Sequence, residues 1–559
     1  MQKIYKGEEY SYFESNLNLL RNKCKSKCFE FNSLSSNEPK KQKELMKTII
    51  NTKTDNFYIN KTFNCNFGNN ISIGDNFYSS FNLTLIDENK ISFGNNIYLG
   101  PNCTFNTINN PSFDKKKRSE RILTANTINI GNNVFFEGQI IVTSGVTIND
   151  NVIIKAGSKI NKNIPSNSIV EGINCEINQL HINIGDSIKN YCLEMINKEL
   201  TDEKFLNSKK INEEFNNTKL DNFDKLNSII KNLYKSHKNI FQTQKCHIQN
   251  GDNTSLSENF YTNYNFVLLD TEQILINKNS FIGPNGVINN NTINIENNEF
   301  KIIPKPIKIG ENCWIASNVY IKGGVTIEDN STIGANSVVL SDIPKNCVAF
   351  GNPAKIMRKF TIVHNERVVD INDKRSEKEK SLNGELYFTG GEELSNDRIS
   401  SFKICFDYNK INPINIIERK NILKKHFGMI KDDNFEIDSN FNCDYGYNIS
   451  IGKNFKSFYN ILILDENYII IGDNVTLGPN ISLLTAIHPI EDIINRNSEL
   501  EYAKKIEIGN DVWIEGNVVI LPGIKIGNNV IIESGCVVTK NIPDNCYCGG
   551  NPCKVIKSI

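Results

Sequence analysis

Hydrophobic and polar positions repeat with a period of six along most of this chain. Between residues 449 and 529 the segments read ISIGKN, IIIGDN, VTLGPN, IEIGND and IKIGNN, each opened by an aliphatic residue and closed by Gly, Asn or Asp. An amphipathic helix would show a period of 3.6, and antiparallel hairpins a period of two between irregular turns. A period of six fits a triangular coil of three short strands, with Gly, Asn and Asp at corners that need unusual backbone angles. The pattern therefore predicts a solenoid of stacked β-coils.

The solenoid pattern occurs three times. FNCNFGNNISIGDNF, which begins at Phe63, returns 378 residues later as FNCDYGYNISIGKNF, and a middle copy is marked by Trp314, 199 residues before Trp513. Such self-similarity indicates tandem domains, and we expect copy one at 1–180, copy two at 181–370 and copy three at 371–559. SNLNLLRNKC and ELSNDRISSFKICFDYN look helical before the coils of copies one and three, whereas copy two has NYCLEMINKEL and NSIIKNLYKSH.

Several motifs carry a family resemblance. They are G-E-x-Y at 7–10 and 384–387, ILDEN at 463–467, TAIHPI at 485–490 and GNPCK at 550–554. The chain resembles the hexapeptide-repeat acyltransferases, most closely the maltose/galactoside O-acetyltransferase group. The resemblance implies a mainly β fold of left-handed parallel β-helices, which in this family usually assemble as homotrimers with active sites between neighbours. Because one chain carries three copies, we predict a monomer that acts as an intrachain pseudo-trimer rather than a homotrimer.

Composition excludes several other classes of protein. The 559 residues contain 63 Lys plus Arg and 63 Asp plus Glu, so no chain-wide basic field favours nucleic acid or an anionic membrane. There is no run of 18 apolar residues and no apolar leader, which predicts a cytoplasmic protein that does not insert into membranes. The 15 cysteines are interpreted as reduced thiols, and their spacing, such as Cys24-x3-Cys28, predicts no metal site.

One histidine is the candidate catalytic base. Acetyl transfer to a hydroxyl needs a group that removes the hydroxyl proton, and histidine has a suitable pKa. Of six histidines only His488 precedes a proline, in a segment that breaks the period of six and so predicts an extruded loop; the resemblance implies that this position carries the base. Copy one has Asn110 at the corresponding position, and copy two is four residues shorter between Gly283 and Trp314. At most one copy retains the base.

The predicted acceptor site is divided among the copies. The resemblance implies that Asp465 and Glu466 contact the substrate and that an asparagine lies near the acetyl group. Copy two supplies that asparagine as Asn263, whereas copy three has Phe458 there. The acidic residue that follows G-E-x-Y in the family is replaced by Thr389 in copy three. This replacement leaves the identity of the acceptor open.

For acetyl-CoA, the expected co-substrate, the resemblance implies an aromatic residue at the acyl pocket, a Thr-Lys pair, and basic residues after the last coil. Copy three matches these positions most fully, and copy two retains some of them. The expected coenzyme-binding residues are Trp513, Ser534, Thr539, Lys540, Lys554 and Lys557 of copy three, with Trp314, Lys355 and Arg358 of copy two.

Two functions are consistent with the sequence. The first is an acetyl-CoA-dependent O-acetyltransferase that modifies a hydroxyl of a sugar or similar small acceptor, with a single site centred on copy three and His488 as its base. The second is a catalytically inactive β-helical scaffold or binding module, motivated by Phe458 and by the two copies that lack the histidine. The intact motifs of copy three favour the enzyme.

Overall fold

The structure is a computed structural model that describes residues 1–109, 111–234, 240–296, 299–364 and 373–559. Its strands form three stacks, and each stack has three sheets of four to seven strands. Within the coils, consecutive strands belong to different sheets, and strands of successive coils pair in parallel, as β3, β6 and β9 do. Short helices precede each stack. The predicted fold class, tandem left-handed parallel β-helices with short helical segments, is confirmed. The expected boundary near residue 370 lies outside the described residues.

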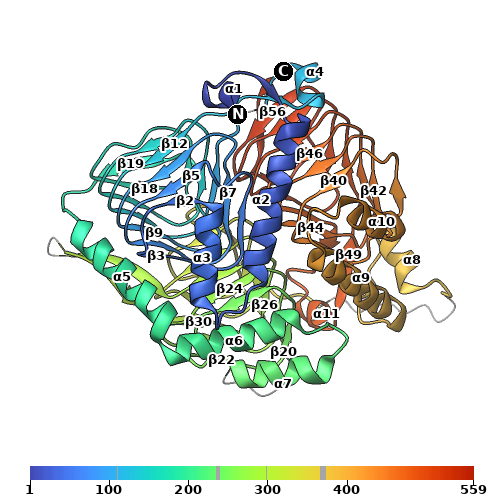
Figure 1. Cartoon of the computed structure of the whole chain (residues 1–559). Coiled ribbons are helices and arrows are strands. Elements are labelled where there is room, and N and C mark those ends of the chain that lie inside the picture. Colours follow the sequence, from blue (N-terminus) through green and yellow to red (C-terminus); the bar gives the residue numbers. More distant parts are fainter. Residues whose placement is uncertain (110, 235–239, 297–298, 365–372) are drawn as a thin grey trace.

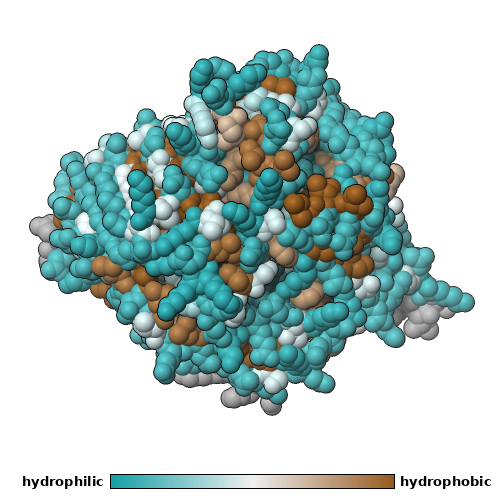
Figure 2. Space-filling view, viewed as in Figure 1, coloured by the Kyte–Doolittle hydropathy of each residue, from teal (hydrophilic) through white to brown (hydrophobic). Residues whose placement is uncertain are grey.

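The three β-helices lie side by side around a common centre, with copy one in blue and cyan, copy two in green and yellow, and copy three in orange and red (Figure 1). Phe81 and Ala156 of copy one pack against Tyr320 of copy two. Ala335 of copy two contacts Val519 of copy three, and copy three contacts copy one through a further mixed cluster. Each copy therefore touches both others within one chain. The surface that faces the viewer is mostly hydrophilic, with hydrophobic side chains gathered in separate patches (Figure 2).

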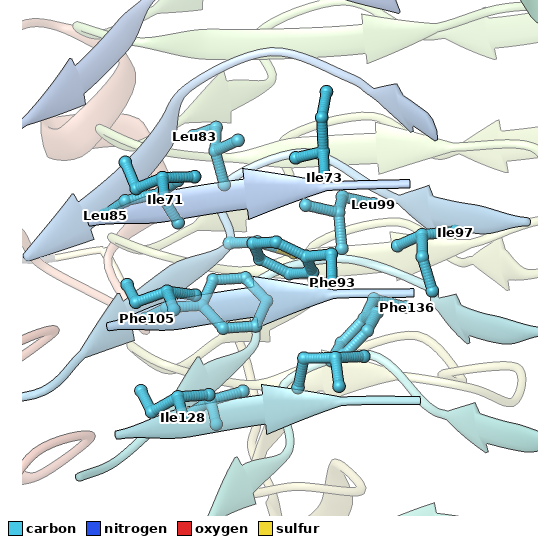
Figure 3. Packing of buried hydrophobic residues seen from close by; sticks show 14 of the residues in the cluster. Ile71, Ile73, Leu83, Leu85, Phe93, Ile97, Leu99, Phe105, Ile128 and Phe136 are labelled. Carbon is cyan, nitrogen blue, oxygen red and sulfur yellow. The ribbon is translucent and has the colours of Figure 1, made fainter. Parts of the chain in front are cut away.

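The interior of each β-helix is a column of aliphatic and aromatic side chains, one from each strand. In copy one, Phe93 lies 5.1 Å from Phe105, which in turn lies 5.5 Å from Phe136, and aliphatic residues such as Ile71 and Ile97 fill the levels beside them (Figure 3). Complete burial of such a side chain contributes about 1.5–3 kcal/mol. This column explains the aliphatic residue at every sixth position of the sequence.

Asparagine residues form the corners of the coils. Asn76, Asn96 and Asn133 all have φ near +60°, a conformation that asparagine tolerates better than most residues. Their side chains form a ladder in which Asn76 donates to Asn96, and Asn96 to Asn133, each over 2.7 Å. The asparagine-rich composition is thus a structural property of the coil corners rather than a sign of disorder.

Helices cover the first coil of each copy and occur in two of the loops. The predicted helical segments before copies one and three are confirmed. Among the described helices, none combines the length and the apolar character that crossing a membrane requires. The helices are α1 (Gln2–Tyr5), α2 (Ser15–Ser33), α3 (Pro39–Ile49), α4 (Lys115–Ser119), α5 (Gly185–Thr201), α6 (Glu203–Asn217), α7 (Phe223–Leu233), α8 (Glu377–Leu382), α9 (Glu392–Lys410), α10 (Ile416–His426) and α11 (Ile493–Asn497).

One seven-stranded sheet of each copy faces a neighbouring copy. In copy one it contains β3 (Phe57–Ile59), β6 (Phe77–Ser79), β9 (Ile97–Leu99), β13 (Val134–Phe136), β16 (Val152–Ile154), β18 (Ser168–Glu171) and β19 (Glu176–Gln179). In copy two it contains β20 (Ile240–Gln242), β23 (Phe260–Thr262), β26 (Phe281–Ile282), β31 (Trp314–Ile315), β34 (Thr332–Ile333), β36 (Cys347–Phe350) and β37 (Lys355–Lys359). In copy three it contains β40 (Glu436–Ile437), β43 (Lys456–Ser457), β46 (Thr476–Leu477), β51 (Trp513–Ile514), β54 (Val530–Ile532), β56 (Cys546–Gly549) and β57 (Lys554–Ser558).

Each copy also extrudes one loop from its coils. The loop of copy one holds α4 and β11 (Ile122–Leu123), which pairs with β1 (Tyr10–Ser11). Copy two has a hairpin of β28 (Asn291–Glu296) and β29 (Glu299–Pro304). The loop of copy three holds β48 (Ala486–Ile487), α11 and β49 (Leu500–Ala503), which pairs with β38 (Tyr387–Phe388). We call the contact between the seven-stranded sheet of one copy and the loop of its neighbour a seam. Each seam is named first by the copy that supplies the sheet and then by the copy that supplies the loop, which gives the 2–3, 3–1 and 1–2 seams.

Candidate active site

His488, in the loop of copy three, lies on an aromatic row of copy two. Parallel register aligns Tyr261, Phe281 and Trp314 on the outer face of the sheet, with centroids 4.8 and 3.8 Å apart. The His488 ring centroid is 3.9 Å from that of Trp314 and 6.0 Å from that of Phe281. The predicted base of one copy and a predicted coenzyme residue of another thus meet in the 2–3 seam.

Glu501 orients the imidazole. Its Oε2 is 3.1 Å from His488 Nδ1, and its Oε1 accepts a hydrogen bond from the Tyr387 hydroxyl. The antiparallel pairing of β38 with β49 sets Tyr387 directly opposite Glu501. A carboxylate that accepts the Nδ1 proton fixes the tautomer and leaves Nε2 as the basic nitrogen. This arrangement suits a general base.

The environment of the pair shifts both pKa values. Burial, together with the positive charge of Arg496, holds the pKa of His488 well below its usual value. Burial and the neighbouring Glu466 raise the pKa of Glu501 to about 8, and the Tyr387 hydroxyl opposes this rise. The imidazole is therefore neutral at neutral pH, which is the form that accepts a proton.

A row of small residues continues from the aromatic row along one edge of copy two. Backbone hydrogen bonds align Asn263, Gly283 and Ala316 in successive coils. Leu484 and Leu521 of copy three pack against Ala316 and its neighbour Ala335. Register places Thr539 in the next coil after Leu521, and the exposed Lys540 follows it. The Thr-Lys pair of copy three thus borders the same seam as Trp314.

The backbone N–H expected to face the coenzyme differs among the copies. In copy three, Ser534 N and Oγ both donate to Glu515 Oε2, over 3.0 and 2.9 Å. In copy one, Ala156 N donates to Glu137 Oε2 over 3.0 Å. Copy two has Ala316 in place of the glutamate, and within the described ranges the N–H of the corresponding Ala335 has no protein acceptor.

The basic residues of copy two border the 2–3 seam. Strand pairing continues the aromatic row from Trp314 through Thr332 and Val348 to Arg358. Arg358 forms an ion pair with Glu491, which lies three residues after His488 in the same loop. Lys355 lies on the same strand, β37, and is exposed. Lys355 and Arg358 therefore lie near the end of the aromatic row that is opposite to Tyr261.

Four of the predicted coenzyme residues lie elsewhere. Trp513 packs in a cluster with Tyr12 and Ile108 of copy one, and Lys557 lies 4.0 Å from the Phe113 ring of copy one. The backbone N–H of Ser534 is bound by Glu515, and Lys554 shares strand β57 with Lys557. The residues of copy two that were expected in a site centred on copy three, Trp314 and Arg358, thus lie beside the His488 loop, whereas these four residues of copy three do not.

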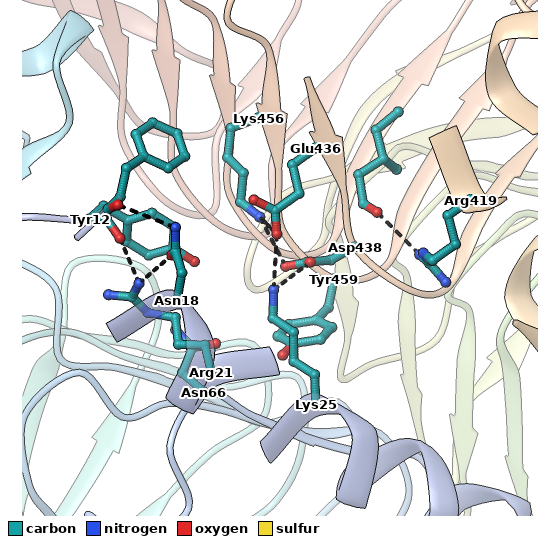
Figure 4. Close-up of polar contacts among 12 residues, drawn as sticks. Tyr12, Asn18, Arg21, Lys25, Asn66, Arg419, Glu436, Asp438, Lys456 and Tyr459 are labelled. Carbon is teal, nitrogen blue, oxygen red and sulfur yellow. Dashed lines mark hydrogen bonds and ion pairs between the residues drawn. The ribbon is translucent and has the colours of Figure 1, made fainter. Parts of the chain in front are cut away.

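Large side chains of copies one and three meet in the 3–1 seam, beside a cavity lined by Ile108, Trp513 and Ser534. Arg121 of copy one donates to Asn454 and Thr476 of copy three. Lys25 of α2 reaches Asp438 at 2.6 Å beside Lys456, as Figure 4 shows. Phe458 packs in the same region, with its ring 5.7 Å from that of Tyr12. Asn110, which replaces the histidine in copy one, lies outside the described residues.

Large side chains also pack in the 1–2 seam, beside a cavity lined by Tyr78, Ser80 and Glu199. Tyr98 and Phe135 of copy one stack at 4.5 Å, and Tyr191 of α5 lies 5.0 Å from Tyr98. Phe300, on the hairpin that replaces the histidine loop in copy two, lies 5.6 Å from Phe135. These contacts occupy the space that the His488 loop borders in the 2–3 seam.

The predicted acceptor pair divides into two roles. Both carboxylate oxygens of Asp465 accept backbone N–H groups, from Tyr445 over 2.9 Å and from Gly446 over 2.8 Å, and the residue is fully buried. Asp465 therefore holds a turn. Glu466 instead accepts from Thr485 over 2.8 Å, and the burial of Asp444 together with the charge of Glu466 raises the pKa of Asp444.

Glu501 was not predicted from the sequence, although a signal was present. The offset of 378 residues places Leu123 of copy one opposite Glu501, so the copy that lacks the histidine also lacks its carboxylate. Copy one also closes its acceptor region, because Arg21 binds both oxygens of Glu88 at 2.8 and 2.7 Å. In copy three Arg398 binds Tyr445 and the carbonyl of Thr389 instead.

Known proteins resemble individual copies of this chain. The bacterial transferase hexapeptide profile matches residues 306–341 and 505–540, and the maltose acetyltransferase capping motif matches residues 380–431. Galactoside O-acetyltransferase of Escherichia coli is 36% identical over 176 residues, which are 32% of this chain and 86% of that protein. A putative acetyltransferase of Dictyostelium discoideum is 41% identical over 189 residues, 34% of this chain and 97% of that protein.

A solved structure, a maltose O-acetyltransferase from Clostridium difficile 630, is 45% identical and covers 33% of this chain and 98% of that chain, with a TM-score of 0.32. Each of these relatives is matched over most of its own length by about one third of this chain. The family predicted from the motifs is confirmed: the chain belongs to the hexapeptide-repeat acetyltransferases, in the maltose and galactoside O-acetyltransferase group.

Proposed function

We propose that this chain is an acetyl-CoA-dependent O-acetyltransferase whose active site is the 2–3 seam, and that it acetylates a hydroxyl of a sugar or similar small acceptor. The observation that carries the proposal is the His488 ring, which is bound to Glu501 and lies 3.9 Å from the ring of Trp314 in another copy. The named activity of the Escherichia coli relative supports a sugar acceptor. The loops of copies one and two contain no histidine, which supports a single site per chain.

The proposed reaction needs one proton relay. His488 Nε2 takes the proton of the acceptor hydroxyl as its oxygen attacks the thioester carbonyl. The Asn263 side-chain oxygen accepts from Tyr264 N over 2.7 Å, so its NH₂ is the free end that would donate to the developing oxyanion. Collapse of the intermediate breaks the carbon–sulfur bond, and the imidazolium proton goes to the departing thiolate. The products are the acetyl ester and coenzyme A.

We assign the coenzyme to the edge between copies two and three. Ala316, which replaces the glutamate of the other two copies, would leave room for the pantetheine arm, and the N–H of Ala335 would donate to one of its amide carbonyls. Lys540 and Arg358 are placed to bind phosphates, with Thr539 and Lys355 beside them. Arg358 would exchange Glu491 for a phosphate when the coenzyme binds.

The acceptor would lie at the other end of the aromatic row. Burial raises the pKa of the Tyr261 hydroxyl of copy two, and Asp444, Glu466 and Glu501 of copy three add to the rise, which Arg398 opposes. Carboxylates that converge in this way are acceptors for sugar hydroxyl groups. We further propose that the chain works as a pseudo-trimeric monomer in the cytoplasm, which the mutual contacts of the copies and the 15 free cysteines support.

The direct test of this function is release of free thiol from acetyl-CoA in the presence of a panel of galactosides, maltose and other hydroxyl acceptors. We expect thiol release that depends on the acceptor and equals the amount of acetyl ester formed. If the correctly folded protein turns over none of the hydroxyl acceptors, the proposal fails and the inactive scaffold remains.

Substitution of Glu501 by glutamine is expected to lower kcat about 100-fold and to change its pH dependence. The raised pKa of Glu501 means that the carboxylate, which stabilises the imidazolium, forms as the pH rises through about 8. We therefore expect wild-type kcat to rise up to that pH, and the rise to be absent in the Gln variant. A kcat–pH profile from 5.5 to 9.5 measures both effects, and an unchanged profile would contradict the role given to Glu501.

The two tryptophans provide a matched pair of variants. Trp314→Phe is expected to raise the KM for acetyl-CoA about fivefold, because the aromatic stacking surface is reduced. Trp513→Phe is expected to leave KM within about twofold, because Trp513 lies in the 3–1 seam and copy one has Phe135 at this position. Binding of coenzyme A should change the fluorescence of Trp314, so the change persists in Trp513→Phe and disappears in Trp314→Phe. The reverse result would place the coenzyme in the 3–1 seam.

A further inference from the structure

A cluster of metal-ligating side chains lies away from the active site, where α9 and α10 cover the first coil of copy three. Cys405 comes from α9, His426 ends α10, and Cys443 ends strand β41 (Phe441–Cys443). Their exposed fractions are 2%, 7% and 0%, and their ligand atoms all lie within 4.8 Å of one another. Sequence spacing did not reveal this group, because its members are 17 to 38 residues apart.

We propose that Cys405, His426 and Cys443 bind one zinc ion that ties α9 and α10 to the first coil of copy three. Cys405 Sγ lies 3.6 Å and His426 Nε2 lies 3.3 Å from Cys443 Sγ. Tetrahedral zinc with ordinary bond lengths needs separations of about 3.8 Å between two sulfurs and about 3.5 Å between sulfur and nitrogen. The cluster thus needs small adjustments to hold zinc.

Ser401, one turn before Cys405 on α9, supplies a fourth donor. Its Oγ lies 3.0 Å from His426 Nε2 and 3.6 Å from Cys443 Sγ. This oxygen would complete the tetrahedron. Gly446 keeps the approach to His426 open, because a Cβ there would lie 2.3 Å from Nε2. The donors come from both covering helices, from the coil and from no other copy.

Charge balance favours this cluster over a related one in copy one. On binding, two thiols release their protons to solvent without any redox change, and zinc with two thiolates and a neutral imidazole carries no net charge. Such a group can be buried at low electrostatic cost. In copy one Cys24, Cys28 and Cys65 form the corresponding cluster, with sulfurs 3.4 and 3.5 Å apart. Three thiolates would leave a buried negative charge, and Ile49 ends the helix where copy three has His426.

Copy two shows what the same position contains when no metal-ligating group is formed. Ser208 and Asn212 of α6 hydrogen-bond to the carbonyl of Ile248, and the Asn212 amide takes the place that the second thiol has in the other copies. The helix is thus held to its coil by ordinary hydrogen bonds. The chain therefore contains its own comparison for a metal-free junction.

Metal analysis of the full chain tests the proposal. The protein is produced in minimal medium with added zinc, and separately with cobalt, and its metal content is measured by mass spectrometry after gel filtration. We expect about one metal ion per chain. The cobalt form should show the intense near-ultraviolet absorption of thiolate-to-metal charge transfer. Fewer than about 0.1 ions per chain in both media, with no such absorption, would overturn the proposal.

Variants assign the metal to its ligands. Cys405→Ser and His426→Leu are expected to lose at least about 90% of the bound metal, whereas Cys24→Ser, in the cluster of copy one, should retain it. Loss of metal from Cys24→Ser, or full retention in the other two variants, would overturn the assignment to copy three. If a copy-three variant does not fold, Ser401→Ala combined with the cobalt spectrum decides, because loss of the oxygen donor shifts the visible bands of a bound ion.

Discussion

Replacement of His488 by alanine is expected to lower kcat about 1,000-fold while the KM for acetyl-CoA stays within about twofold, because the base acts in the chemical step. Nε2 is the nitrogen left free by the contact of Nδ1 with Glu501, and no other side chain on the aromatic row of copy two is a comparable base. Steady-state thiol release, with saturating acceptor, measures both constants.

His181→Ala is the matched control for this experiment. His181 is exposed and stands at the boundary of copies one and two in the sequence, outside the 2–3 seam. We expect wild-type kcat for this variant and unaltered circular dichroism for both. Activity that survives His488→Ala in a folded protein would remove His488 from the mechanism and would require another base in another seam.

Substitution of Ala316 by glutamate is expected to lower kcat/KM for acetyl-CoA at least about 100-fold. This change copies into the 2–3 seam the residue that copies one and three have at the same position. By analogy with Glu515 and Glu137, the new carboxylate would accept the N–H of Ala335 and occupy the edge assigned to the pantetheine arm. It would also repel the coenzyme phosphates. Initial rates at subsaturating acetyl-CoA measure the effect.

Glu515→Ala is the control in the opposite direction. It removes the capping carboxylate from the 3–1 seam, which is bordered by the loop of copy one, a loop without a histidine. We expect kcat/KM within about twofold of the wild type. Equal activity of wild type and Ala316→Glu would show that the coenzyme does not pass along the edge of copy two. A large loss in Glu515→Ala would move the coenzyme to the 3–1 seam.

The sequence predicted the fold well because the coil is a local structure. Each unit of six residues places one aliphatic side chain inside and one small or asparagine residue at a corner. The interior position of Ile71 and the corner position of Asn76 can therefore be predicted from the local sequence alone. The loops, the helical openings and the candidate base could be found in the same way, since they interrupt the period.

The composition of the site could not be predicted in this way, because it depends on which copies meet. His488 and Asn263 lie in different copies, and from the sequence this separation counted against an active enzyme. In the structure the His488 loop rests on the sheet that carries Asn263 and Trp314. Trp513 shows the opposite case: it shares a copy with His488 but packs against copy one.

Hydrogen bonding determined the other differences. Asp465 matches a substrate-binding position, yet its oxygens are used by the backbone of the turn below it. Ser534 matches a coenzyme position, yet Glu515 caps its amide. Neither contact follows from residue type or spacing, because each depends on a partner about 20 residues away in an adjacent coil. Glu501 was missed because its contacts with His488 and Tyr387 come from the folding of the loop rather than from a motif.

Fusion of the three copies allows each seam to evolve separately. In a symmetric homotrimer one substitution alters all three interfaces at once, so a change that strengthens packing but blocks the substrate abolishes every site. Here Arg121 packs into the 3–1 seam and Phe300 into the 1–2 seam, while His488 lies in the 2–3 seam. The chain can therefore gain stability at two junctions without loss of turnover at the site proposed for the third, at the cost of having one proposed active site where a homotrimer of this mass would have three.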